Sequence, residues 1–224
     1  MDEYGKINTG KTIHLVLDNA RYQKSDVVLS NVIKIGNEVT MPKPELTKKL
    51  LADTLKKLIS QKPLDKISVG EIVDTAGLNR QTFYYHFADK QELVCWIFDT
   101  EVAMLTDKNQ NNTLFDDLME YIYSEKEFYI AALTSDVQNN LREHIYNVGR
   151  SWVINKIISV LGERELDENA ITLFSRFLTN AAVGSLVRWA QEGMKTDPAQ
   201  YNADYAPIIV DYLEFLVNKY SKQQ

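Results

Sequence analysis

The chain has 224 residues, 45% of them apolar and 25% charged, which is the composition of an ordinary globular protein. No apolar run approaches the roughly 20 residues that cross a bilayer, and the first residues lack the charged-then-apolar plan of a signal peptide. Cys95 is the only cysteine, which excludes an internal disulfide and a cysteine-based metal cluster. These features predict a cytoplasmic protein that does not enter a membrane.

The formal net charge of −6 is unevenly spread along the chain. Residues 1–40 carry five basic and five acidic side chains, and residues 41–101 carry nine of each. Residues 102–224 carry eleven basic and seventeen acidic side chains, so the whole acidic excess lies there. Because phosphate contact depends on local charge, a neutral segment can bind DNA if its basic groups gather on one face. The charge therefore permits DNA binding without predicting it.

The first 40 residues carry a β-type pattern that the rest of the chain lacks. The runs TIHLVLD and VVLSNVIKIGNEVT read as strands, the second of them around the turn pair Gly36-Asn37. Two or three strands with no sheet to join are marginally stable at best. We therefore expect residues 1–40 to form a poorly packed extension, or to precede a true start at Met41.

The pattern turns helical after this stretch. Apolar residues at helical spacing run through residues 46–59, and Pro63 ends that helix. Ser68 and Glu71 form a capping-box pattern that opens a short helix, which Gly77 ends. Another short helix follows at once. Helix, short helix, tight turn and short helix are the signature of a helix-turn-helix.

The second short helix lies in the stretch NRQTFYYHF, residues 79–87, which crowds hydrogen-bonding and aromatic groups together. Phe83 and Phe87 point to one side, where they pack on the preceding helices, and leave the polar groups on the other. A helix that enters the major groove by its N-terminal end needs this arrangement. The expected contacts are Arg80 to guanine, Gln81 to adenine, Tyr84 to a thymine methyl, and Thr82, Tyr85, His86 and Lys90 to phosphates.

Residues 47–101, above all ISVGEIVDTAGLNRQTFYYHFADKQEL, closely resemble the DNA-binding domain of TetR-family transcription regulators. The positions that fall on the family's typical run are Ser68, Ile72, Ala76, Gly77, Leu78, Thr82, Phe83, Tyr84, His86, Phe87, Lys90 and Leu93. The resemblance implies base contacts by Arg80, Gln81 and Tyr84, and DNA-backbone contacts by Ser68, Thr82, Tyr85, His86 and Lys90. Gln81 stands where the family commonly has a small residue or proline, so base preference is not carried over from relatives.

Five further helices are expected at about residues 113–123, 125–133, 137–160, 167–192 and 204–221. The last two carry broad apolar faces, which suit a core or a second copy of the chain. The resemblance implies a homodimer through these two helices, and a two-fold dimer reads a pseudo-palindromic operator. The predicted fold is all-α, with a three-helix helix-turn-helix DNA-binding domain over residues 41–92 and a helical regulatory and dimerisation domain over residues 93–224.

The stretch YSEKEFYIAALTSDVQNNLREHIYNVGRSWV is similar to a subgroup of that family, the activators of dihydroxyacetone kinase operons. This similarity implies an activator that works with a protein co-activator related to a kinase subunit. The alternative is a repressor with a small-molecule effector in its C-terminal helices. The candidate ligand residues are His144, Arg142, Arg150, Arg176, Arg188, Trp152 and Trp189, each of which also fits a surface, interface or core position.

Residues 9–30, with IHLVLDNARYQKS, resemble the strand of a DDE-type transposase that carries a metal-binding aspartate, here Asp18. Two-metal chemistry needs several carboxylates from separate strands of a full sheet, and the helical remainder supplies no such sheet. Cys95 has no activating base, and no metal or cofactor is expected. The chain is predicted not to be an enzyme. A nuclease fragment and a helical interaction module without DNA binding stay as competing classes.

Overall fold

The computed structural model describes residues 33–35, 38–40, 43–108, 114–135, 140–162 and 164–221. The chain divides into two compact units, Met1–Leu46 and Thr47–Gln224. In the first unit, strand β1 (Ile33–Ile35) pairs with strand β2 (Glu38–Thr40) in an antiparallel register that sets Ile33 opposite Thr40. This pair agrees with the strands expected on either side of Gly36-Asn37. The transposase-like residues 9–30 lie outside the described residues.

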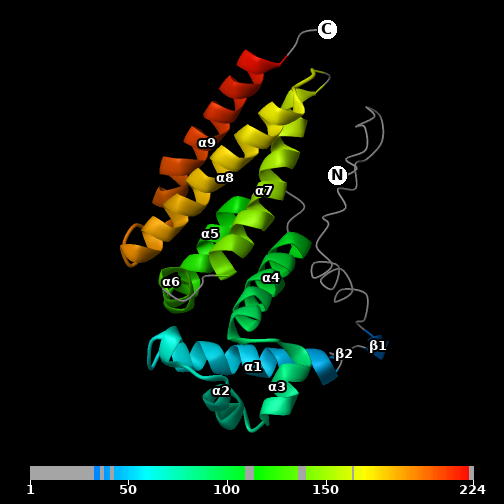
Figure 1. The fold of residues 1–224 in the computed structure, drawn as a ribbon, viewed down its shortest axis with the longest axis vertical. Coiled ribbons are helices and arrows are strands. Elements are labelled where there is room, and N and C mark those ends of the chain that lie inside the picture. The colour runs from blue at the N-terminus through cyan, green and yellow to red at the C-terminus, as the bar shows by residue number, and fades with distance from the viewer. Residues whose placement is uncertain are drawn as a thin grey trace. The chain divides into compact units, whose positions relative to one another are not determined.

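The second unit is helical, as predicted (Figure 1). Within the described residues the elements are α1 (Lys43–Ile59), which begins just before this unit, the 3-10 helix η3 (Leu64–Lys66), α2 (Val69–Ala76), α3 (Arg80–His86), α4 (Lys90–Lys108), α5 (Leu114–Ser124), α6 (Lys126–Thr134), α7 (Asn140–Leu161), α8 (Glu168–Gln191) and α9 (Pro198–Tyr220). The all-α fold class is confirmed.

Local capping builds the helix-turn-helix. The Ser68 side chain accepts a hydrogen bond from the Glu71 backbone N–H, while the Glu71 side chain accepts one from the Ser68 backbone N–H, so the predicted capping box is present. Gly77 ends α2 with φ of 68°, a left-handed conformation that glycine adopts without steric cost. Asn79 then caps α3 by accepting from the Thr82 backbone N–H at 2.8 Å. The tight turn between α2 and α3 follows directly from these residues.

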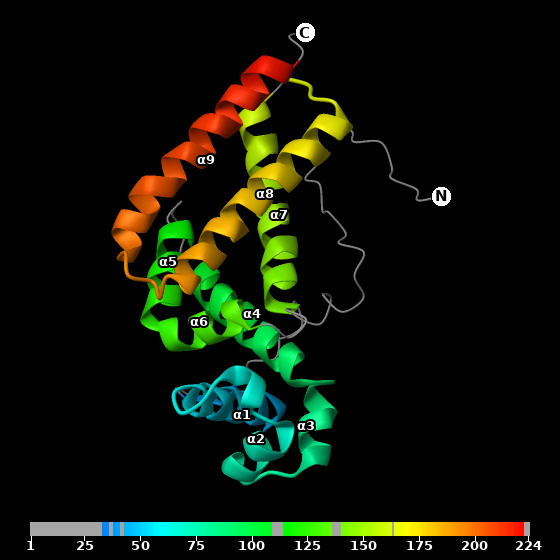
Figure 2. The same cartoon turned by 60° about the vertical axis from the view of Figure 1, so that its left-hand side comes forward.

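Two hydrophobic clusters hold the described helices together. The first runs from α1 through α6 into the N-terminal part of α7 and the C-terminal part of α8, and it buries Phe83 and Phe87 almost completely. The second joins α7, α8 and α9, which lie side by side in both views (Figures 1 and 2). Its buried members are Ile157, Leu161, Phe174, Leu178, Leu213, Leu216 and Val217. The predicted role of Phe83 and Phe87 as the buried side of α3 is confirmed.

Helix α9 begins earlier than the sequence analysis expected. The predicted start near residue 204 is wrong, because α9 starts at Pro198. Asp197 caps it by accepting from the Gln200 backbone N–H at 2.9 Å, and proline at the first helical position gives up no hydrogen bond. Pro207 therefore lies inside the helix.

Helices α8 and α9 leave large apolar side chains in solvent. By length and composition alone α8 is apolar enough to cross a membrane, in contrast to the expectation from the sequence, and only 28% of its most apolar window is buried. Yet its polar residues Ser175 and Thr179 are buried within the bundle, and Arg150 on α7 bonds to Ser175. We define the α8–α9 face by its exposed members Leu173, Phe177, Tyr205, Ile208, Tyr212 and Phe215. These exposed side chains form an apolar surface across the two helices.

Candidate nucleic-acid interface

Helix α3 presents the polar face that its sequence predicts. With Phe83 fully buried, Arg80, Gln81, Tyr84 and Tyr85 are all exposed. Tyr84 is 56% and Tyr85 80% exposed, values that leave both rings free of the protein core. Tyr84 still packs edge-on against Phe83, with ring centroids 5.5 Å apart, so its direction is fixed from behind. These side chains form an outward surface of donors and aromatic rings.

Two hydroxyl groups predicted to reach phosphates are also used in the helix caps. The Ser68 hydroxyl accepts from the Glu71 N–H and donates to a Glu71 carboxylate oxygen, both at 3.2 Å. The Thr82 hydroxyl donates to Asn79 Oδ1 at 3.0 Å. A hydroxyl carries one proton, so a bond to a phosphate oxygen would replace either of these side-chain bonds.

Lys90 also stabilises the protein fold, a role that the sequence did not indicate. Its ammonium donates to the backbone carbonyls of Leu64 at 2.5 Å and Ile67 at 2.7 Å, which fastens η3 and the loop after it to the start of α4. Burial lowers the pKa of Lys90, against the raising influence of Asp65 and Glu71. An ammonium has three donors, so one remains for a phosphate.

The cap at the start of α2 carries an ion pair that makes it sensitive to acid. The Lys62 ammonium bonds to Glu71, and this bond, with the Ser68 backbone N–H, lowers the pKa of Glu71 to about 2. A carboxyl whose folded pKa lies below its unfolded value adds stability above the unfolded pKa of about 4.3, and that stability is lost as the pH falls.

We therefore expect Glu71→Gln to flatten the acid limb of stability between pH about 4.3 and about 2, as followed by urea unfolding at each pH. Asp74→Asn, which removes an exposed carboxylate from the same helix without touching the cap, is the matched control for the loss of one negative charge. An acid limb as steep in Glu71→Gln as in the wild type would contradict the role given to this cap.

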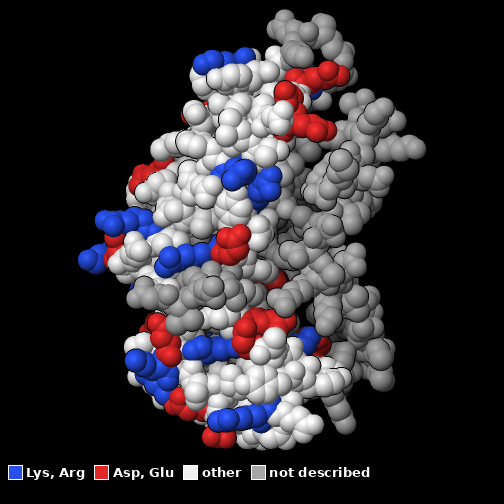
Figure 3. Space-filling model, in the orientation of Figure 1, with Lys and Arg blue, Asp and Glu red and all other residues white. Residues whose placement is uncertain are grey.

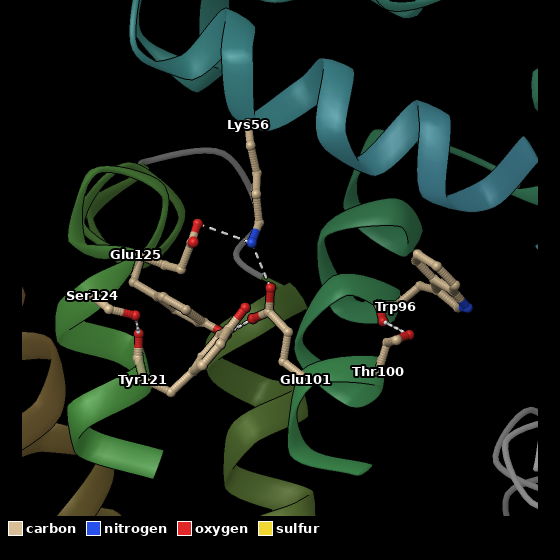
Figure 4. Close-up of polar contacts among 8 residues, drawn as sticks. Lys56, Trp96, Thr100, Glu101, Tyr121, Ser124 and Glu125 are labelled. Atoms are coloured by element: carbon tan, nitrogen blue, oxygen red, sulfur yellow. Dashed lines mark hydrogen bonds and ion pairs between the residues drawn. The ribbon is translucent and has the colours of Figure 1, made fainter. Parts of the chain in front are cut away.

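A polar cluster joins α1 to the helices that follow the helix-turn-helix. Figure 4 shows Lys56 pointing from α1 toward two carboxylates, with Nζ 2.5 Å from Glu101 Oε1 and 3.0 Å from Glu125 Oε2. Glu101 is 7% exposed and also accepts from the hydroxyl of the fully buried Tyr129. The Lys56 ammonium lies 5.9 Å from the ring centroid of Tyr121, within cation–π range. Lys56 thus adds polar contacts with α4, α5 and the residue before α6 to the apolar packing of α1.

The cluster also sets the protonation of its members. Burial alone would lower the pKa of Lys56, but its hydrogen bonds and attraction to Glu101 and Glu125 outweigh burial and leave the pKa raised. Burial, followed by the charge of Glu101, raises the pKa of Tyr121 to about 12 and that of Tyr129 well above its ordinary value. The lysine is therefore charged and both tyrosines are neutral donors at physiological pH.

Basic and acidic groups alternate over the helix-turn-helix on the face drawn in Figure 3. This agrees with the balanced charge of residues 41–101. On the face drawn, the charged residues do not form a broad basic surface of the kind that neutralises many phosphates.

Two family comparisons cover most of this architecture. The family described as bacterial regulatory proteins, tetR family, matches residues 51–95, and a transcriptional regulator C-terminal region of the same class matches residues 110–209. The chain belongs to the TetR family. Both matches are to transcription regulators, which confirms that the chain belongs to a non-enzymatic family. Neither match reaches the transposase-like residues 9–30, so that resemblance gains no support.

One curated protein and one solved structure are similar to this TetR-family chain. The HTH-type dhaKLM operon transcriptional activator DhaS of Lactococcus lactis subsp. lactis (strain IL1403) is 32% identical over 126 residues, which is 54% of this chain and 65% of that protein. The match thus spans just under two thirds of the relative. A solved structure named dihydroxyacetone kinase operon activator DhaS has a TM-score of 0.57 at 21% identity, covering 80% of this chain and 99% of that one.

The candidate ligand residues of the C-terminal helices are engaged with the protein itself. Arg142 Nε donates to the Leu133 carbonyl at 2.6 Å, and His144 Nε2 lies 2.6 Å from Asp99 Oδ1. Arg150 donates to the Ser175 hydroxyl and Arg188 to the Glu192 carboxylate. Trp189 donates to the Thr196 carbonyl and stacks on the rings of Tyr123 and Tyr201. Trp152 packs against the first hydrophobic cluster, and Arg176 is exposed.

An open groove of about 590 Å³ lies elsewhere, between α5 and α9. Its polar lining includes Asp116, Glu120, Asn202 and Asp211, and none of the predicted ligand residues borders it. Sequence reasoning missed this groove and the Lys56 cluster, because both bring together residues far apart in the chain.

Proposed function

We propose that this TetR-family chain is a sequence-specific DNA-binding regulator that reads its operator with α3. The observation that carries the proposal is the face of α3, where Arg80, Gln81 and Tyr84 stand exposed on a helix that Phe83 anchors from behind. Arginine bonds bidentately to guanine O6 and N7, and glutamine to adenine N6 and N7. Ser68, Thr82, Tyr85, His86 and Lys90 are the proposed backbone contacts that fix the register.

Selection of bound sequences from random duplex DNA tests this assignment. The wild-type protein should enrich one pseudo-palindromic site, and Arg80→Ala should relax preference at one base pair in each half-site, with affinity about 10- to 100-fold lower. Lys49→Ala, which removes an exposed cation from α1, is the charge control and should keep the base preference. Equal preference in wild type and Arg80→Ala would sink the role of Arg80.

We further propose a homodimer formed through the α8–α9 face. Support comes from the exposure of its large apolar side chains, which a stable monomer would bury. Two copies of an identical face meet with two-fold symmetry, and the resulting dimer presents two copies of α3 to a pseudo-palindrome. Such a regulator works in the cytoplasm, where the chromosome lies.

The regulated operon is proposed to be one for dihydroxyacetone kinase, with this chain as an activator assisted by a protein co-activator. The 32% identical relative is an activator of the dhaKLM operon by name, which supports both the operon and the direction of control. A protein partner is favoured over a small ligand because four of the predicted ligand residues, Arg142, His144, Arg150 and Arg188, bond within the protein. The division of the chain at residues 40/41 and 92/93 remains a prediction.

Transcription in vitro from a promoter that carries the selected site distinguishes activator from repressor. Adding a dihydroxyacetone-sensing protein related to the kinase's substrate-binding subunit should raise transcription only when this regulator is present. Repression by the regulator alone, relieved by a small metabolite, would instead establish the ligand-responsive repressor.

A further inference from the structure

We propose that Gly70 is a positioning residue for Arg80: its missing side chain makes room for the guanidinium of Arg80 across the first turn of α2. The inference rests on the proposed DNA-binding function. It adds Gly70, which is not itself proposed to contact a base or a phosphate. Gly70 of α2 and Arg80 of α3 would then act together in base recognition.

The geometry is specific to these two residues. A Cβ atom built on Gly70 would lie 2.8 Å from Arg80 Nη2 and 3.6 Å from both Arg80 Cζ and Nε. The three nearest heavy atoms thus all belong to the guanidinium of Arg80. Gly70 is buried although it lies in the first turn of a surface helix, whereas Arg80 as a whole stays exposed. The guanidinium therefore covers the Gly70 backbone with part of its surface and leaves the rest open.

Nothing else in the local structure calls for glycine at this position. The glycines with positive φ are Gly77, Gly162 and Gly193, so the backbone of Gly70 has an ordinary helical conformation. Glycine is a poor helix former, and an alanine in the same turn would favour α2. A side chain at this position would occupy the space in which the Arg80 guanidinium lies.

A seated guanidinium suits the reading of a base. Arginine has many rotamers in solvent, and fixing them on binding lowers affinity unless the side chain is already placed. Gly70 lies in the first turn of α2 and Arg80 is the first residue of α3, so the guanidinium spans the N-terminal turns of the two helix-turn-helix helices. Ser68, a proposed backbone contact, caps the same turn. The guanidinium of Arg80 thus lies between Ser68, a proposed contact to the DNA backbone, and the side of α3 that is proposed to face the bases.

A double-mutant cycle tests the proposal on the full chain. Wild type, Gly70→Ala, Arg80→Ala and the double variant are titrated against the selected operator and against operators changed at each base pair. We expect Gly70→Ala to reduce discrimination at the Arg80-dependent base pair about three- to tenfold, because its Cβ displaces the guanidinium. In the Arg80→Ala background the same substitution should change nothing.

Gly149→Ala is the matched control, since a Cβ at that helical glycine meets only Thr179 Cγ2, at an ordinary 3.7 Å, and it should leave discrimination intact. Thermal unfolding checks that Gly70→Ala keeps the fold. An equal effect of Gly70→Ala with and without Arg80, or discrimination that is unchanged or improved, would overturn the inference while the proposed function stands. A wild type that selects no site would remove the proposed function, and the inference with it.

Discussion

A glutamate in place of Phe177 should leave the protein folded but monomeric, with operator affinity lowered roughly 10²- to 10⁴-fold, the gain that linking two half-site contacts provides. Phe177 is 57% exposed and lies on the α8–α9 face, with its ring centroid 5.8 Å from that of Tyr212 on α9. A carboxylate buried among the apolar side chains of this face would lose its hydration, which costs several kcal/mol unless it is paired. Light scattering during gel filtration and a DNA titration measure both effects.

Met104→Glu is the control for this substitution. Met104 is a 49% exposed apolar residue on α4, outside the α8–α9 face, so its replacement should keep the dimer and the affinity. A Phe177→Glu protein that remains dimeric would show that the second copy binds elsewhere. The α8–α9 face would then not be the dimer interface.

The second large effect should come from Lys56→Met, which we expect to destabilise the fold by roughly 2–4 kcal/mol. Methionine keeps the unbranched apolar stem of the lysine, one atom shorter, but leaves the buried carboxylate of Glu101 without its cation. We expect a loss nearer 2 than 4 kcal/mol, roughly, because the Lys56 side chain is 21% exposed and water can partly solvate the Glu101 carboxylate left behind. Urea unfolding measures the loss, and Lys57→Met, an exposed neighbour on α1, should cost far less.

Two further readouts separate a specific ion pair from a loss of packing. Adding Glu101→Gln to Lys56→Met should restore part of the stability, since the uncompensated charge is then gone. The pKa of Lys56 is raised in the folded state, so its contribution is fully present below about pH 10 and is lost as the pH rises through the folded pKa. A double variant no more stable than Lys56→Met would contradict the assignment.

Local signals made the helix-turn-helix predictable. The cap residues Ser68, Glu71 and Asn79 act within three residues of their partners, so spacing along the chain is enough to find them. Helix α9 shows the limit of such reasoning. A start near residue 204 puts Pro207 in the first turn, where proline is tolerated, but Asp197 and Pro198 carry the same signal earlier and form the actual start.

The parts of the site that escaped prediction depend on contacts between distant residues. Lys56 is 45 positions from Glu101 and 69 from Glu125, and no periodicity links them. The sequence places Arg80 in the first turn of α3 but does not reveal that Gly70 of α2 makes room for it. Lys90 was expected as an exposed point charge, and only the fold shows its bonds to two backbone carbonyls.

Methylation interference on the selected operator tests the central claim most directly, because a methyl group on guanine N7 blocks the acceptor that an arginine fork needs. We expect wild-type binding to be blocked by methylating one guanine in each of two symmetric half-sites, whose centres lie about one helical turn apart or a multiple of it. Binding by Arg80→Ala should lose this sensitivity to methylation. Interference at the same guanines in both proteins, or at none in the wild type, would contradict the reading of DNA by Arg80 on α3.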